Sequence, residues 1–357
     1  LAREMPPGNR PRPPEAEVAA ITPWLESAIT DGQPGKRDPG RVTMRRLNRS
    51  EYNNTIRDLL AVDFQPADDF PSDDVGYGFD NIGDVLSLPP ILLEKYLAAA
   101  EKIAKKAIEL KGPRDAKPER PESHQRIVSC EPSGPGKREC LQRILERLAT
   151  RAYRRPATEG EVHRLLGLVA LAEADGGSVE EGIQLALEAV LVSPHFLFRV
   201  ETDPDPSDPD AAHPVSDFEL AARLSYFLWS SSPDEDLFDL ARSGTLRKDG
   251  NLEAQALRML RHPKARSLTE DFCGQWLTIR NLATVTPDKG KFPAFDEELR
   301  GAMRRETELF FEAIVKEDRS ILDFIDADFT FLNARLARHY GHAGVDGSDF
   351  QRVPLTG

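Results

Sequence analysis

The sequence lacks an excess of positive charge, any long apolar run and more than a few cysteines. Its 47 basic residues are outnumbered by 60 acidic ones, and the resulting formal charge of −13 repels phosphate backbones. We therefore expect no nucleic-acid partner. No apolar run approaches the ~20 residues that a membrane-spanning helix needs, so we expect no transmembrane segment in this chain.

Several catalytic and cofactor signatures are also absent. The chain has no G-x-S-x-G, no HExxH, no Walker A and no Rossmann glycine pattern. It has no CxxCH either, so this chain by itself cannot attach a haem covalently. The motifs identify no catalytic residue, and whether the protein is an enzyme stays open.

The residues that are present predict a globular all-α protein. Hydrophobic residues make up 39% and charged residues 30% of the 357 positions, enough for two or three compact domains. Helical periodicity recurs along the chain, with no alternating pattern that would build a large sheet. The fold class predicted is several consecutive helical bundle-like domains with long turn-rich loops.

Helix boundaries can be read at several points. Asn48 with Glu51, and Thr158 with Glu161, have the spacing of capping boxes that begin helices. A long helix is predicted from Ile91 to about Lys111. Near the start, apolar residues in 15–30 predict a short helix, which we expect to begin nearer Thr22 because Pro23 lies inside it.

Cys130 and Cys140 bracket the turn-rich segment CEPSGPGKREC. A disulfide there would close a short loop and would favour an exported protein. The alternative is two free thiols, which have neither metal-ligand spacing nor a nearby histidine. Cys273 lies among apolar helix positions and is expected in the core.

An acidic loop is the candidate metal site. Asp73, Asp74, Asp80 and Asn81 are oxygen-bearing residues among glycines, which are features of calcium loops. The spacing differs from that of an EF-hand, and no glutamate closes the loop. The alternative is that these side chains cap helices and stabilise turns through local backbone hydrogen bonds.

Two further groups have structural explanations. Glu308 and Glu312 share a helix face, and Arg304 stands four residues before Glu308, which predicts a salt-bridged face. His339 and His342 have a spacing that can place two metal ligands on one helical face, but no third ligand is evident.

Long stretches resemble one multidomain family. They are LNRSEYNNTIRDLL, FPSDDVGYGFDN, ILERLATRAYRRPAT, LVSPHFLFRVE, LAARLSYFLWSSSPDEDL and DADFTFLNARLARHYG. Together they resemble the planctomycete cytochrome-c-linked family, in which consecutive domains of unknown function follow a planctomycete-type cytochrome c domain. The resemblance covers essentially the whole chain and implies an exported protein, although it implies no reaction.

The resemblance also gives a role to the opening EMPP. In the family the haem domain ends in Met-Pro-Pro and a Trp-bearing helix, and by position Met5 matches the axial haem ligand. The alternative is an exposed methionine in a flexible terminus. With Met5 as ligand, the chain is expected to be an internal fragment of a longer protein that holds haem c.

The expected domains follow from the resemblance and the helical pattern. They are a cytochrome c remnant (1–33), a helical domain (34–112), a linker with a short strand in HQRIVSC (113–136), a three-helix domain (137–202), an acidic spacer (203–215), a second helical domain (216–345) and the start of a truncated segment (346–357).

The expected function is electron transfer at haem c, in which the helical domains act as a scaffold or docking module for a redox partner protein. One alternative is a haem-coupled oxidoreductase with a catalytic pocket between helical domains. Another is a structural or adhesive surface protein. A pocket with converging carboxylates or histidines would favour the enzyme over a scaffold.

Overall fold

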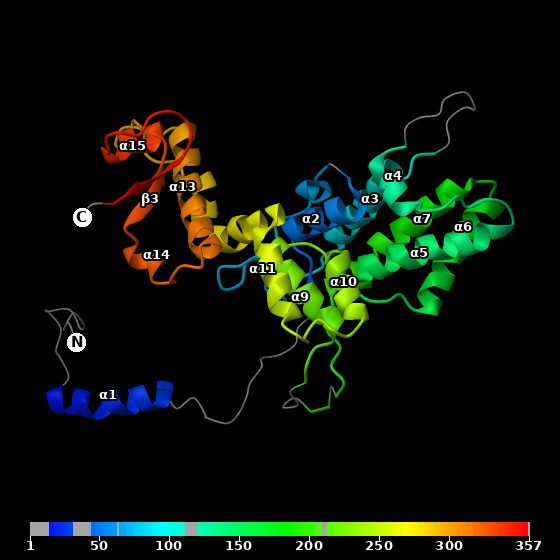
Figure 1. Ribbon diagram of the computed structural model, residues 1–357, viewed down its shortest axis with the longest axis horizontal. Helices are drawn as coiled ribbons and strands as arrows, with labels where there is room; N and C mark the ends of the chain where they lie inside the picture. The colour runs from blue at the N-terminus through cyan, green and yellow to red at the C-terminus, as the bar shows by residue number, and fades with distance from the viewer. Residues whose placement is uncertain are drawn as a thin grey trace. The chain divides into compact units, whose positions relative to one another are not determined.

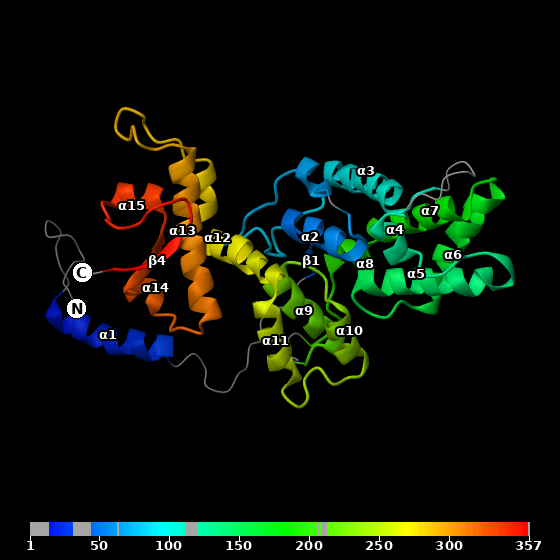
Figure 2. The same ribbon diagram turned by 45° about the horizontal axis from the view of Figure 1, so that its top comes forward.

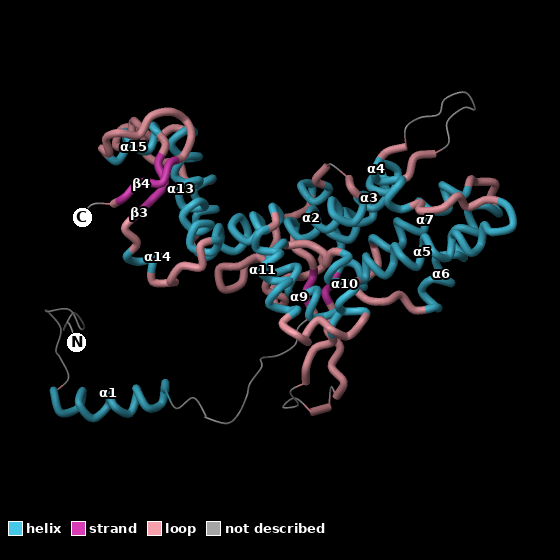
Figure 3. The backbone as a smooth tube through the Cα atoms, viewed as in Figure 1, coloured by secondary structure: helices cyan, strands magenta, loops and turns pink. Residues whose placement is uncertain are grey.

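The computed structural model describes residues 14–30, 44–62, 64–110, 120–205, 207–208 and 213–355. Its described part is mostly helical, with two small two-stranded antiparallel sheets (Figure 3). The all-α prediction is therefore confirmed. No described helix has the length and apolarity needed to cross a bilayer.

The chain divides into two compact units, of which the smaller combines residues 1–42 and 203–214. Its helix α1 spans Glu15–Thr30. The helix continues through Pro23, so the expectation of a start nearer Thr22 was wrong. Proline removes one backbone N–H, which is a local loss, and the helix continues on both sides of it. The neighbouring Thr22 hydroxyl donates to the Val18 carbonyl at 2.8 Å. Trp24 is 67% exposed.

The larger unit, residues 43–202 and 215–357, begins with the short strand β1 (Arg45–Arg46) and helix α2 (Arg49–Leu60). The predicted capping box is present: the Asn48 side chain accepts from the Glu51 N–H, and the Glu51 carboxylate accepts from the Asn48 N–H. A turn-rich loop containing the 3₁₀ helix η1 (Pro66–Asp69) leads to α3 (Pro90–Ala107).

A second group of helices follows and shares a core with α2 and α3. Its elements are α4 (Glu122–Ile127), η2 (Gly134–Gly136), α5 (Lys137–Tyr153), α6 (Glu159–Ala174), α7 (Val179–Leu191), α8 (Pro194–Leu197) and β2 (Phe198–Arg199). Figure 2 shows α5, α6 and α7 side by side. One continuous set of buried side chains runs from Leu47 to Leu197 and includes Tyr226. Strand β1 pairs with β2, which joins the two ends of this region.

The third region has its own core around the fully buried Trp229. Its elements are α9 (Asp217–Trp229), α10 (Glu235–Arg242), α11 (Asn251–Arg261), η3 (Pro263–Ala265), the π-helix η4 (Leu268–Cys273), α12 (Gly274–Trp276) and η5 (Ile279–Ala283). Figure 1 shows α9, α10 and α11 close to one another. The π-helix is a rare conformation that often occurs at functional sites.

The last described elements pack around α13 (Glu297–Lys316). They are α14 (Asp323–Asp326), β3 (Phe329–Leu332), α15 (Ala334–Tyr340) and β4 (Gln351–Pro354). Strands β3 and β4 pair in register from Phe329 opposite Pro354 to Leu332 opposite Gln351, and Val353 is buried with Leu332 in a small third core.

One expected element is wrong. The segment HQRIVSC forms no strand: its first four residues belong to helix α4, in which His124 and Ile127, three residues apart, share one buried helical face. The expected domains 34–112 and 137–202 share a single hydrophobic core.

Candidate functional site

The residues predicted for haem and disulfide chemistry have different outcomes. Met5 lies outside the described residues. Cys130 and Cys140 form a disulfide, with their Cα atoms 6.0 Å apart. Cys273 is fully buried, and burial raises the pKa of its thiol to about 12, helped by the negative charges of Glu308 and Glu312. A thiol with so high a pKa is not a nucleophile at neutral pH.

The side chains of the predicted calcium loop do not converge on one point. Asp73 accepts hydrogen bonds from the Arg46 guanidinium and the Arg49 N–H, each at 2.8 Å. Asp74 accepts from the Ser87 hydroxyl at 3.4 Å. Within the described residues, no three His, Cys, Asp or Glu side chains are grouped to hold a metal ion, and this includes the surroundings of His339 and His342.

Asp80 instead belongs to a set of paired polar side chains, which we call the polar network: Asn48, Glu51, Asp80, Arg199, Asp271 and Arg280. One Asp80 oxygen accepts from the Asn48 amide at 2.8 Å and the other from Arg280 at 2.6 Å. Arg280 also donates to Asp271 at 2.6 Å. The network thereby joins the loop after α2 to the segment around the π-helix.

Two carboxyl groups of the polar network have raised pKa values. Burial raises the pKa of Glu51, although Arg199, 3.0 Å away, and the Asn48 N–H favour the ionised form. Burial also raises the pKa of Asp271, while hydroxyl groups of Ser230 and Ser50 and the charge of Arg280 oppose the shift. Every charged member faces an oppositely charged one, so the network has the character of a structural contact.

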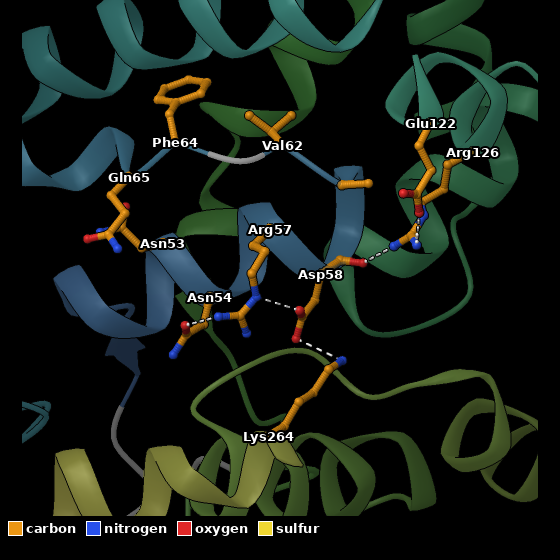
Figure 4. A pocket seen from close by; sticks show the side chains of 11 residues that line it. Asn53, Asn54, Arg57, Asp58, Val62, Phe64, Gln65, Glu122, Arg126 and Lys264 are labelled. Carbon is orange, nitrogen blue, oxygen red and sulfur yellow. Dashed lines mark hydrogen bonds and ion pairs between the residues drawn. The ribbon is translucent and has the colours of Figure 1, made fainter. Parts of the chain in front are cut away.

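An open cavity of about 590 Å³ lies beside α2 and is the candidate functional site, which we call the α2 pocket. Its lining comprises Asn53, Asn54, Arg57, Asp58, Ala61, Val62, Phe64, Gln65, Glu122, Arg126 and Lys264. These residues come from α2 and the residues after it, from α4, and from η3. Figure 4 shows the polar side chains of α2 and α4 and Lys264 around one opening.

Asp58 is the centre of the pocket's charged groups. Its carboxylate accepts from Arg57 at 2.9 Å and from the Ser231 hydroxyl at 2.7 Å, and it pairs with Lys264 at 2.9 Å. Burial alone would raise the pKa of Asp58, but Arg57, Lys264 and Ser231 outweigh it and lower the pKa. The carboxylate therefore stays ionised and holds two cations in place.

The α4 side of the pocket carries a second pair. Arg126 donates to Glu122 and to the backbone carbonyl of Asp58, both at 2.8 Å. Three residues after α4 comes Cys130, whose disulfide fixes this segment to Cys140 in α5. The α4 wall of the pocket is therefore joined to α2 by the bond from Arg126 to Asp58 and to α5 by the disulfide.

The sequence pattern does not predict this pocket, although four of its residues lie in the segment LNRSEYNNTIRDLL. Asn53, Asn54, Arg57 and Asp58 lie on the polar face of an amphipathic helix, which is ordinarily a solvated face. The signal available was a run of amide and charged side chains at positions three and four apart. The partners, Arg126 and Lys264, are far away in the sequence.

The predicted salt-bridged face of α13 is confirmed. Arg304 pairs with Glu308 at 2.7 Å, and Arg305 pairs with both Glu308 and Glu312 at 3.1 Å. These glutamates therefore serve the packing of α13.

Three family models match the chain, all of them described as proteins of unknown function. Residues 45–109 match PSD3 (DUF1587), residues 140–201 match PSD5 (DUF1595) and residues 215–342 match PSD4 (DUF1592). These are planctomycete cytochrome-c-associated domains of unknown function. No curated protein and no solved structure matches the chain.

Proposed function

We propose that this chain is the ligand-binding part of an exported, c-type-cytochrome-linked protein, and that a small polar molecule binds in the α2 pocket. The observation that carries the proposal is the pocket itself. A cavity of about 590 Å³ is within the size range of small-molecule sites, and its walls come from separate regions of the chain.

The lining favours binding over covalent catalysis. Among the described residues that line the pocket there is no serine, cysteine or histidine. The lowered pKa of Asp58 keeps its carboxylate ionised, which makes it a poor proton donor at neutral pH. The chemistry offered is therefore ionic and hydrogen-bonding recognition.

The residues of this chain do not fit a covalently held haem. Attachment of haem c uses two cysteine thioethers, but Cys130 and Cys140 are joined to each other and Cys273 is buried in the core. The haem, which would supply one-electron transfer, would have to be held by a separate cytochrome c domain. Met5 as an axial ligand stays a prediction.

Two observations support the cytochrome link and the export. The three matched domains are cytochrome-c-associated, and the Cys130–Cys140 disulfide suits an oxidising compartment.

The experiment is ligand-observed NMR of the 357-residue chain with glucose and glucuronate as probes. We expect saturation transfer to at least one probe, and loss of it in Gln65→Trp, because Gln65 lines the pocket and the indole would fill it. Arg242→Gln is the control, because the Arg242 side chain is exposed on α10 and does not line the pocket. Absence of transfer to both probes, or transfer unaffected by Gln65→Trp, would contradict the proposal.

A second candidate is a docking module for a redox partner protein. The formal charge of −13 favours it, since an acidic surface attracts a basic partner. The test is the association of a basic c-type cytochrome at rising ionic strength. Binding that does not weaken with salt would contradict this role.

A further inference from the structure

The α2 pocket has an excess of positive charge within an acidic protein. Three cations, Arg57, Arg126 and Lys264, face two carboxylates, Asp58 and Glu122. The formal charge of the whole chain is −13, so this local sign is opposite to that of the protein. A cavity with such a charge raises the local concentration of small anions.

The cations are held in place by bonds that leave donors unused. Arg57 donates through Nε to Asp58 and through one terminal nitrogen to Asn54, both at 2.9 Å. In the described part of the chain its second terminal nitrogen has no hydrogen-bond partner. The Lys264 Nζ lies 2.9 Å from an Asp58 carboxylate oxygen, and this contact uses one of the three N–H donors of the ammonium. The side chains are therefore oriented before a ligand arrives, which lowers the cost of binding.

Amide side chains stand on another side of the opening. Asn53, Asn54 and Gln65 line the pocket, and Figure 4 shows Asn53 and Gln65 together, away from Arg126. Asn53 accepts from the Ala67 N–H at 2.8 Å and donates to Asp68 at 3.3 Å, and Asn54 accepts from Arg57 at 2.9 Å. An amide has two N–H donors, so both keep at least one for a hydroxyl oxygen, and the Gln65 amide can both donate to and accept from a hydroxyl group. Val62 and Phe64 add an apolar wall between the two polar sides.

We propose, on the basis of the ligand-binding function above, that the ligand is a hydroxylated organic acid of about the size of a sugar acid. Its carboxylate lies between Arg57, Arg126 and Lys264. Its hydroxyl groups bond the amides of Asn53, Asn54 and Gln65. The chain recognises the anion and the hydroxyl-bearing body together.

The experiment is calorimetric titration of the 357-residue chain with three probes: sodium glucuronate, glucose and sodium acetate. We expect glucuronate to bind at least tenfold more tightly than either of the other two. Its dissociation constant should rise when 200 mM NaCl is added, because salt screens exposed charges.

Variants test which side chains bind the carboxylate of glucuronate. Arg57→Gln and Arg126→Gln should each raise the dissociation constant of glucuronate at least tenfold, and Arg242→Gln should leave it unchanged. The Arg57 side chain is 50% exposed and that of Arg126 is 35% exposed, and the two lie on different helices, so each variant tests the carboxylate position independently of the other.

Each contrary result has a distinct meaning. If glucose binds as tightly as glucuronate and Gln65→Trp abolishes that binding, the ligand needs no carboxylate. This result would overturn the proposal of an anionic ligand while the proposed binding function stands. If acetate binds as tightly as glucuronate, the hydroxyl groups contribute nothing, and the proposal of a hydroxylated ligand would be overturned. No binding of any probe would overturn both this proposal and the proposed function.

Discussion

The α2 pocket and the polar network are built from the same residue types but differ in how much of their charge meets solvent. In the network, the side chains of Glu51 and Asp80 are 4% and 19% exposed. In the pocket, those of Arg57 and Glu122 are 50% and 73% exposed. Both join the matched 45–109 region to later parts of the chain. The Glu51 and Asp80 carboxylates are largely closed off from water and join parts of the chain, whereas Arg57 and Glu122 remain open to a ligand.

The carboxyl groups of the two regions respond to their surroundings in opposite ways. The pKa of Asp58 is lowered because cations and a hydroxyl outweigh burial, whereas the pKa values of Glu51 and Asp271 are raised because burial dominates. Mutations at the two places should therefore differ in size and in pH dependence.

The largest effect is expected from Arg280→Ala in the network. The change leaves Asp80 and Asp271 close together without their shared cation. We expect the free energy of unfolding to fall by about 2–4 kcal/mol, somewhat less than for a fully buried pair, because the Arg280 side chain is 32% exposed. Urea denaturation measures this. A loss no greater than that of Arg242→Ala would mean that the network does not hold the domains together.

Removing the disulfide should come next. Cys130→Ser combined with Cys140→Ser frees a loop with a sequence separation of 10 and should cost about 2–3 kcal/mol, since the unfolded chain is no longer restricted. Thermal unfolding of the natural chain with and without a reductant is the parallel measurement. Equal unfolding midpoints in both states would show that α4, and with it one pocket wall, does not depend on this bond.

A pH series separates the two kinds of carboxyl. We expect Asp58→Asn to cost about 1–2 kcal/mol at pH 7 through lost charged hydrogen bonds. Because its folded pKa is lowered, the Asp58 contribution is present above the ordinary carboxyl pKa of about 4 and is lost as the pH falls through the folded value.

Glu51→Gln should show the opposite sign. The folded pKa of Glu51 is raised, so the natural chain gains stability relative to the variant as the pH falls through that value towards the ordinary one. Denaturation midpoints from pH 8 to pH 3 check both variants. Parallel pH curves for the two variants would contradict the contrast.

The smallest effect is expected from Lys264→Met. The change removes the ion pair with Asp58. It also removes the cation–π contact with Trp229, whose ring centre lies 5.1 Å from the Lys264 nitrogen. Because Asp58 keeps Arg57 and the Ser231 hydroxyl as partners, the loss should be about 0.5–1 kcal/mol. Glucuronate affinity should nevertheless fall clearly. A large stability loss without a change in affinity would place Lys264 with the network instead of the pocket.

Much of the fold was predictable because its signals are local. Capping boxes at Asn48 and Thr158 depend on residues three apart, and both are present. The helix predicted from Ile91 to about Lys111 spans Pro90–Ala107. The error at α4 also has a local cause, since a short apolar run looks alike in a strand and in a buried helix.

The candidate site was not predictable because its contacts are distant in sequence. Asp58 meets Lys264, and Asp80 meets Arg280, each across about 200 residues. The sequence alone shows four acidic or amide side chains in the loop 73–81, which are compatible with a calcium loop and with local capping and turns. In the fold, Asp73 instead accepts a hydrogen bond from Arg46, and Asp80 accepts one from Arg280. No local sequence pattern reveals these partners.

The π-helix Leu268–Cys273 also determines where the chain can change in length. A π-turn holds one residue more than an α-turn, and each residue of an α-helix rotates the chain by about 100°. Deleting one residue here would return the segment to α geometry and change the position of Asp271 relative to Gln275 and Arg280, whose side chains bond the Asp80 loop. We therefore expect the contacts between this segment and the Asp80 loop to depend on the length of the π-turn as well as on its side chains.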